Sequence, residues 1–252
     1  MTSNLANTFA PTGLLRAAIN LGNPILANRH PDTGLPFGVS VDLAHELARR
    51  LGVGLELVVF DGAAKSVEAI TQQQADLGFF AVDPLRAAGI YFTAPYVLIE
   101  GSYLVRKSSA LQSNAEVDVP GNKVAVGKGS AYDLFLTRTL KAASIVREEG
   151  AEAALAAFRQ QQLNVLAGIR QMLQAEAAKD SELRLLPGNF MLIQQAMGCP
   201  KSFPAQAAAY LSQFVADMIS SGFVGDALAR HQIQGASVAP LEADGTAVSR
   251  PR

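Results

Sequence analysis

Asp83 and Arg86 are the residues of this chain whose types and spacing most clearly suggest chemistry. Two residues separate them in AVDPLRAAGIYFTAPY, residues 81–96, where the neighbouring side chains are otherwise apolar. An arginine fork can hold a carboxylate through two parallel hydrogen bonds. The alternative is a local Asp–Arg pair at a DP turn, and pairs of that kind are common and weak at protein surfaces.

The segment GKGSAYD, residues 127–133, is a second candidate binding element. It follows the apolar run KVAV and opens a helical pattern, so Ser130 can cap a helix with Asp133 at the third helical position. The amides of Gly129 to Tyr132 could then bind an anion such as a ligand carboxylate. The alternative is that this segment is a helix cap alone.

Other catalytic and cofactor patterns are absent from the sequence. There is no P-loop, no GxGxxG at the first βα turn, no GxSxG elbow and no HExxH, and the three histidines lack ligand spacing. Cys199 is the only cysteine, so neither an intramolecular disulfide nor a cysteine-based metal cluster can form. We therefore expect no cofactor, no metal and no catalysis.

The composition is that of a globular protein with a small ligand. The chain has 252 residues, 49% of them hydrophobic and 17% charged, and a net charge of -1 without a basic cluster. Nucleic acids and anionic membrane surfaces are therefore poor candidates for partners. No apolar run approaches the length of a membrane span, and the N-terminus lacks the pattern of a secretion signal.

The order of apolar runs predicts alternating strands and helices, which is typical of βαβ crossovers and a parallel sheet. Strands are predicted at 14–22, 55–60 and 77–81, separated by helices near 41–51 (capped by Ser40 and Gly52) and 64–74. The pattern restarts at GSYLV, 101–105, after which 106–122 is polar. Strands KVAV, LNVLAGI, LRLLPG and FMLIQQAMGC then follow, with helices between them and two amphipathic helices after Phe203.

Five segments in this order resemble the family 3 extracellular solute-binding proteins, the polar amino-acid binding components of ABC importers. They are LRAAINLGNPIL, LPFGVSVDLAHELARRLGV, ADLGFFAVDPLRA, IYFTAPY and NKVAVGKGSAYDLFL, and the resemblance covers the chain from about Leu14 to Gln232. It implies an α/β, two-lobed periplasmic-binding-protein-like fold of type II, with a ligand cleft between the lobes. Lobe one would be residues 1–104 plus 196–252 and lobe two 105–195, each with its own sheet, and 236–252 would be a mobile tail.

The resemblance also implies a function and a set of contacts. The chain would bind an amino acid or a related carboxylate-bearing solute without catalysis and deliver it to an ABC permease. In the family pattern Arg86 grips the ligand α-carboxylate, while Ser130 and the N–H of Ala131 form the second carboxylate clamp. We expect the site to include also Ala81, Asp83, Gly129, Arg170, Gln195 and Asn23.

Three positions depart from the family pattern. Asp83 stands where the family has Ser or Thr, Gly168 or Ile169 replaces the acid that takes the ligand ammonium, and Ala63 or a neighbour replaces a stacking aromatic. Asp83 would then either take over the ammonium or only orient Arg86. Arg170 would favour a second acidic group on the ligand if it faces the cleft, and would do nothing if it faces solvent.

Two rival functions remain open at this point. Some relatives of the family are dehydratases acting on cyclic acids, so an enzyme on the same fold is one alternative, and a cytosolic ligand sensor is the other. The resemblance implies a periplasmic monomer. Without a signal peptide, the protein would be cytoplasmic if this chain is the complete gene product.

Overall fold

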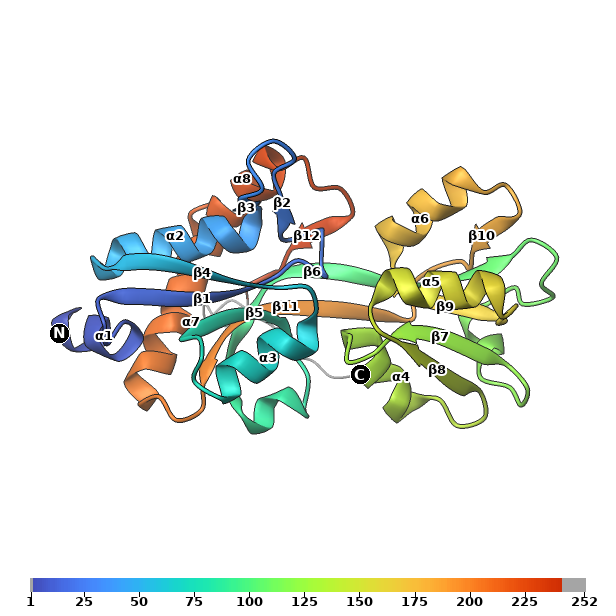
Figure 1. The fold of residues 1–252 in the computed structure, drawn as a ribbon, viewed down its shortest axis with the longest axis horizontal. Coiled ribbons are helices and arrows are strands. Elements are labelled where there is room, and N and C mark those ends of the chain that lie inside the picture. Colours follow the sequence, from blue (N-terminus) through green and yellow to red (C-terminus); the bar gives the residue numbers. More distant parts are fainter. Residues whose placement is uncertain (1, 242–252) are drawn as a thin grey trace. The chain divides into compact units, whose positions relative to one another are not determined.

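The computed structural model describes residues 2–241 as a mixed α/β protein whose chain divides into two compact units (Figure 1). Unit 1 consists of Met1–Leu98 and Gln194–Arg252, and unit 2 of Ile99–Ile193. Each unit has its own buried hydrophobic cluster: Ile70, Phe80 and Ile90 lie in that of unit 1, and Phe158 and Leu166 in that of unit 2. Each unit therefore has a core of its own.

The sheet of unit 1 is built around parallel strands. β1 (Leu14–Asn20) lies between β4 (Gly54–Phe60) and β5 (Leu77–Ala81) and is parallel to both. β11 (Met191–Pro200) pairs with β5 in the antiparallel direction. Because β1 and β5 are parallel neighbours, their carboxyl ends lie at the same edge of the sheet, which is where open α/β sheets bind ligands.

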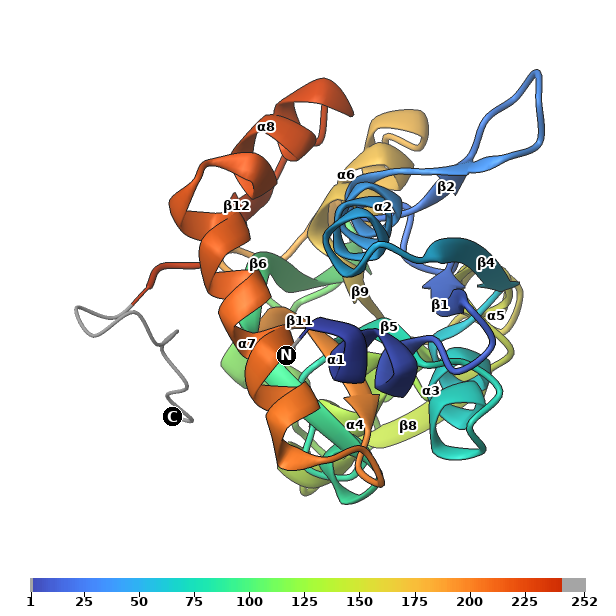
Figure 2. The same ribbon diagram turned by 90° about the vertical axis from the view of Figure 1, so that its left-hand side faces the viewer.

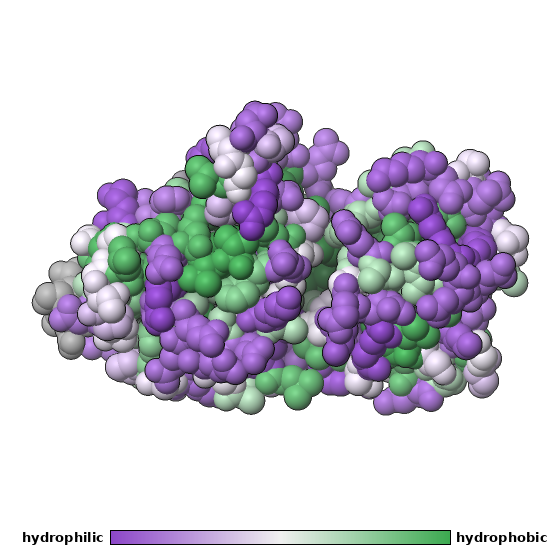
Figure 3. Space-filling view, in the orientation of Figure 1, coloured by the Kyte–Doolittle hydropathy of each residue, from purple (hydrophilic) through white to green (hydrophobic). Residues whose placement is uncertain are grey.

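Two helices connect these parallel strands and lie on opposite faces of the sheet (Figures 1 and 2). α2 (Val39–Leu51) leads from β1 outward to β4, and α3 (Ala63–Thr71) leads back across β1 to β5. Right-handed crossovers that run in opposite directions along a sheet place successive helices on opposite faces. Apolar surface gathers over unit 1 near β4, an edge strand whose last four residues are half-buried (Figure 3).

The start of α2 differs from the prediction. Gly38, not Ser40, is the N-cap, and Ser40 lies inside the helix with 2% of its surface exposed. Gly38 has φ 127°, and a Cβ there would come within 2.5 Å of the Leu26 carbonyl oxygen, so the close approach of the Leu26 backbone requires glycine. The predicted end of the helix is confirmed, since Gly52 is a left-handed C-cap.

Unit 1 contains seven further helices and strands. They are α1 (Thr2–Phe9), β2 (Asn28–Arg29), β3 (Pro36–Phe37), the short 3₁₀ helix η1 (Arg86–Ala88), α7 (Ala205–Ser220), α8 (Phe223–Arg230) and β12 (Ala236–Val238). β12 pairs with β6, and the N–H of Ala239 donates to the Tyr96 carbonyl at 3.0 Å. The first residues of the predicted mobile tail are therefore paired, and residues 242–252 lie outside the described part of the chain.

Unit 2 repeats the α/β theme with a smaller sheet. β7 (Lys123–Gly127) is parallel to both of its neighbours, β8 (Ser144–Glu148) and β9 (Val165–Ile169). β6 (Ile90–Arg106) pairs antiparallel with β9, and also with β10 (Leu183–Leu185). The helical elements of unit 2 are η2 (Asn114–Val117), α4 (Ala131–Thr139), α5 (Ala151–Gln160) and α6 (Arg170–Lys179).

Strands β6 and β11 run from one unit into the other. The division between the units falls at 98/99 in β6 and at 193/194 in β11, and the expected lobe limits, 104/105 and 195/196, fall within the same two strands. The hydrogen-bonded strand order is continuous: β4-β1-β5-β11-β6-β9-β7-β8. The expectation of a separate sheet in each half was therefore wrong, because the crossovers are themselves long strands that pair in both units.

Candidate functional site

Unit 1 gathers five of the predicted site residues around the carboxyl edge of its sheet. Asp83 and Arg86 follow β5, and Asn23 follows β1, its parallel neighbour. Ala81 is the last residue of β5 and stands opposite Gln195 of β11. These residues, which are far apart in the sequence, thus lie near the carboxyl ends of β1 and β5, where β11 pairs with β5.

Arg86 is a buried cation at this edge. It opens η1, is 7% exposed, and its Nη1 donates to the Ala81 carbonyl at 3.0 Å. Burial lowers the pKa of Arg86, and the nearby negative charge of Asp83 opposes that shift. A guanidinium that has lost much of its water interacts strongly with a carboxylate. This environment suits the binding of an anionic group.

Asp83 is bound to the turn that carries Arg86. It is 3% exposed, and its Oδ1 accepts the Leu85 N–H at 2.9 Å while its carbonyl accepts the Ala87 N–H at 2.9 Å. Such an Asx turn fixes the backbone between the carboxylate and the arginine. The contacts support a positioning role for Asp83, and its contact with a ligand ammonium stays a prediction.

Two of the predicted site residues in unit 1 have buried carboxamide side chains. Asn23 is 9% exposed and Gln195 is 5% exposed. The Asn23 Oδ1 is buried without a hydrogen-bond partner among the described residues. Because a buried acceptor without a donor costs free energy, this oxygen is suited to accept an N–H from a ligand.

Unit 2 presents a helix N-terminus just after the carboxyl end of the parallel strand β7. The Ser130 Oγ accepts the Asp133 N–H at 3.1 Å, which confirms the predicted cap of α4. Asp133 in turn accepts the Gly129 N–H at 2.8 Å, so this amide is engaged within the cap. The first N–H groups of a helix have no intrahelical acceptor. The amides of Ala131 and Tyr132 are therefore the candidates for binding an anion, and their contact with a ligand stays a prediction.

The α4 cap is anchored to the neighbouring strand. Asp133 is 4% exposed, and its Oδ1 receives the Nε of Arg147 from β8 at 2.9 Å. Arg147 also donates to the Thr137 hydroxyl at 2.8 Å. This network holds the helix start in place, and the sequence did not predict it because β8 itself was missed.

The position of the missing family acid is apolar in the structure. A Cβ on Gly168 would lie 3.2 Å from the Leu173 side chain, and Ile169 is 7% exposed. The next residue, Arg170, forms an ion pair with Glu100 of β6 and donates to the Gly188 carbonyl. Its side chain is 24% exposed. Glu100 was not among the predicted residues, because only the strand pairing brings it to Arg170.

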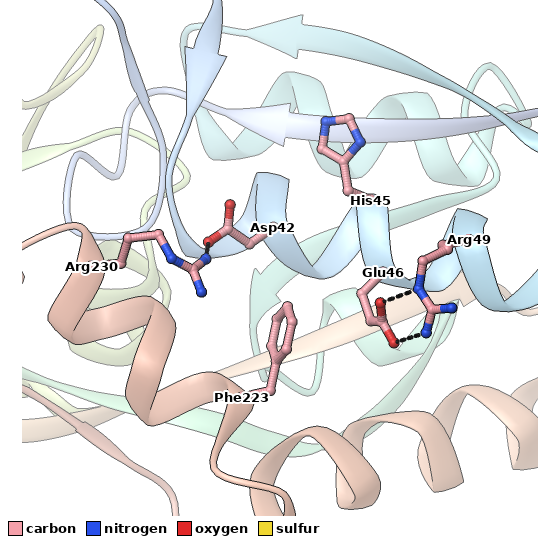
Figure 4. A pocket seen from close by; sticks show the side chains of 6 residues that line it. All are labelled: Asp42, His45, Glu46, Arg49, Phe223 and Arg230. Atoms are coloured by element: carbon pink, nitrogen blue, oxygen red, sulfur yellow. Dashed lines mark hydrogen bonds and ion pairs between the residues drawn. The ribbon is translucent and has the colours of Figure 1, made fainter.

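A surface hollow on unit 1 lies between α2 and α8 and contains none of the predicted residues (Figure 4). Its lining consists of Asp42, His45, Glu46, Arg49, Phe223 and Arg230. Asp42 accepts hydrogen bonds from Arg230 at 2.6 Å, and Glu46 from Arg49 at 2.8 Å. Both carboxylates of the hollow are thus neutralised by neighbouring arginines, so the hollow offers no unmatched charge to a small ionic ligand.

Within residues 2–241, no group of three or more metal-ligating side chains could hold a metal ion. In the same part of the chain, no helix has the length and hydrophobicity needed to cross a bilayer.

Comparison with known proteins finds one family whose profile covers most of the chain. The sequence profile of the bacterial extracellular solute-binding proteins, family 3, matches residues 15–229. None of the curated protein sequences matches the chain.

Solved structures share the fold at low sequence identity. The solute receptor for L-cysteine of Neisseria gonorrhoeae is 20% identical with a TM-score of 0.77, over 98% of this chain and 99% of that one. An amino acid ABC transporter substrate-binding protein of Streptococcus pneumoniae bound to L-arginine is 18% identical with a TM-score of 0.74, over 90% and 99%. An ancestral amino-acid-binding protein, described as a precursor of cyclohexadienyl dehydratase, is 20% identical with a TM-score of 0.72, over 91% and 99%. The fold is therefore the α/β, two-lobed fold of periplasmic binding proteins, as predicted.

Proposed function

We propose that this chain, which belongs to the family 3 bacterial extracellular solute-binding proteins, binds an amino acid or a closely related carboxylate-bearing solute and releases it unchanged to an ABC permease. The family match and the amino-acid-binding proteins among the structural neighbours support an amino-acid-binding role. The ligand itself, the permease and a periplasmic location are parts of the proposal.

The observation that carries the proposal is the environment of Arg86. A guanidinium that is 7% exposed, held by a strand-end carbonyl and lying at the carboxyl edge of a parallel sheet is suited to bind a carboxylate. The Asn23 oxygen beside the same edge adds an acceptor for an ammonium or amide group. In unit 2, the Ala131 and Tyr132 amides offer donors for an anion.

Arg86→Ala and Arg86→Lys test the proposal, with Arg49→Ala as a matched control. Arg49 is also paired with an acid, Glu46, but it lies on the exposed side of α2. Calorimetric titration with a panel of L-amino acids should give a ligand for the wild type and for Arg49→Ala, weaker binding for Arg86→Lys and the weakest for Arg86→Ala. Equal affinity in Arg86→Ala and the wild type would overturn the proposal.

A second candidate function is an enzymatic one, favoured by the structural neighbour described as a precursor of a dehydratase. An enzyme would convert the ligand into a product, whereas a binding protein would leave the ligand unchanged. Incubation of stoichiometric ligand with the protein, followed by mass spectrometry, should recover the ligand with its mass unchanged. Loss of water from the ligand at a rate that depends on protein concentration would favour the enzyme.

A further inference from the structure

The pairing of β6 with β9 brings two opposite charges together at the end of β9. The antiparallel register pairs Ser102 with Gly168 and Gly101 with Ile169. One step further along the register places Glu100 opposite Arg170, and the two side chains form an ion pair. Both residues belong to unit 2, so the pair is a property of that unit alone.

This ion pair is only partly accessible and keeps unused hydrogen-bonding atoms. The side chains of Arg170 and Glu100 are 24% and 38% exposed. Arg170 Nε lies against Glu100 Oε2 in the ion pair but has no hydrogen-bond partner among the described residues, and Nη2 donates to the Gly188 carbonyl. A guanidinium has five N–H donors and a carboxylate has two acceptor oxygens, so both side chains retain hydrogen-bonding capacity beyond these contacts. The pair as a whole carries no net charge.

The pair lies at the same sheet edge as the α4 N-terminus. β7 and β9 are parallel neighbours, pairing Val124 with Val165, so they end side by side about 5 Å apart. β7 leads into the capped start of α4 and β9 leads directly into Arg170. The amides at the start of α4 and the Glu100–Arg170 pair therefore follow two strands that end side by side within unit 2.

We propose that the Glu100–Arg170 pair determines which ligand side chain the protein accepts, and that it selects an amino acid with a neutral carboxamide side chain. This inference rests on the proposed function. A carboxamide carries one acceptor and one donor group, which match the N–H donors of Arg170 and the carboxylate oxygens of Glu100. A basic or acidic side chain would bring an additional charge to a pair that is already neutral, and a poorly solvated charge without a counter-charge is costly.

The experiment uses L-glutamine, L-glutamate and L-ornithine as probes, because their side chains are of similar length and differ in charge. Affinities are measured by calorimetry for the wild type, Glu100→Gln, Arg170→Gln and the double variant. The wild type should prefer L-glutamine. Glu100→Gln leaves the arginine unmatched and should shift the affinity ratio toward L-glutamate by about ten-fold or more, and Arg170→Gln should shift it toward L-ornithine by a similar factor. The double variant, again neutral, should restore the preference for L-glutamine.

Controls separate the failure of this inference from the failure of the proposed function. Arg49→Gln alters an arginine paired with Glu46 on α2 of unit 1, and it should leave all three ratios unchanged. Unchanged ratios in the single variants, together with loss of binding in Arg86→Ala, would overturn the inference alone. If the wild type binds none of the three probes, the inference is overturned. The proposed function would still stand if another L-amino acid of the panel binds the wild type and binds Arg86→Ala more weakly. Thermal unfolding checks each variant, and Arg170→Lys, which keeps the charge, should keep the wild-type ratios if Arg170→Gln does not fold.

Discussion

The carbonyl of Ala81, the last residue of β5, accepts a hydrogen bond from the guanidinium of Arg86 at 3.0 Å. The five-residue separation is spanned by a turn that Asp83 caps through the Leu85 N–H. The strand end thus holds the arginine side chain while the turn holds its backbone. This local arrangement makes Arg86 a preorganised group, and each prediction about ligand binding in unit 1 depends on it.

Arg86→Ala should weaken the binding of an amino-acid ligand by at least about ten-fold. The substitution removes charge-assisted hydrogen bonds to a carboxylate, which contribute on the order of 1.5–3 kcal/mol each. Calorimetry with the tightest ligand of an amino-acid panel gives the ratio. Unfolding midpoints measured without ligand show whether the variant is folded, and an unchanged affinity in a folded variant would refute the role of Arg86.

Asp83→Ala and Asp83→Asn separate positioning from ammonium binding. Asparagine keeps an oxygen that can accept the Leu85 N–H, whereas alanine does not. If Asp83 positions Arg86, Asp83→Ala should weaken an amino acid and its deaminated analogue in parallel, and Asp83→Asn should weaken both less. We expect this result from the observed contacts. A loss in Asp83→Asn that is confined to the amino acid would instead show that the carboxylate binds the ammonium.

Ser130→Ala should lower the free energy of unfolding by about 1 kcal/mol, because it removes the side-chain acceptor for the Asp133 N–H at the start of α4. Urea denaturation followed by circular dichroism measures the change. Ser130→Thr, which keeps a hydroxyl, serves as the control and should retain most of the stability. A Ser130→Ala protein as stable as the wild type would mean that water or another group replaces the cap.

Cys199 should not react with a thiol reagent at pH 8 while the protein is folded. Its side chain is fully buried, and burial raises the pKa of the thiol to about 11, so little thiolate forms at that pH. Labelling with Ellman's reagent should yield one equivalent only after denaturant is added. Rapid stoichiometric labelling of the native protein would contradict the buried position of Cys199 in β11.

The stability contributed by Glu46 should depend on pH in the acidic range. Hydrogen bonds from Arg49, followed by those from Arg50, lower the pKa of Glu46 to about 2. A carboxyl group with a lowered pKa in the folded state stabilises the protein above its unfolded pKa, near 4.5, and loses this contribution as the pH falls toward 2. Glu46→Gln should therefore be less stable than the wild type at pH 7, with a difference that shrinks between pH 4.5 and pH 2. A difference that is constant over this range would contradict the ion-pair origin.

Local patterns were sufficient to predict much of the fold. The run LGFFA was predicted as a strand at 77–81 and forms β5 with these bounds, because a short, continuous apolar run is typical of a buried strand in a parallel sheet. The prediction that Ser130 caps α4 is also confirmed, since a capping box depends only on residues within one turn. Strand β8 and helix α1 were missed, and β6 proved to be a strand of 17 residues where only its last part had been recognised. β8 and β6 are strands whose conformation depends on the neighbours with which they pair, whereas α1 is a short helix with only Leu5 and Phe9 buried among its described side chains.

The sequence alone therefore determined the α/β class, the resemblance to solute-binding proteins and the identity of Arg86 as the carboxylate-binding candidate, because these depend on residue types and on spacings within short segments. Only the tertiary structure decided which groups meet across the chain. It brought Arg147 of β8 to Asp133 at the start of α4, and Glu100 to Arg170 from 70 positions away. Pairing between distant strands depends on register, and a shift of one residue would turn each side chain to the other face. For this reason the pairing of Glu100 with Arg170 could not be predicted from the sequence.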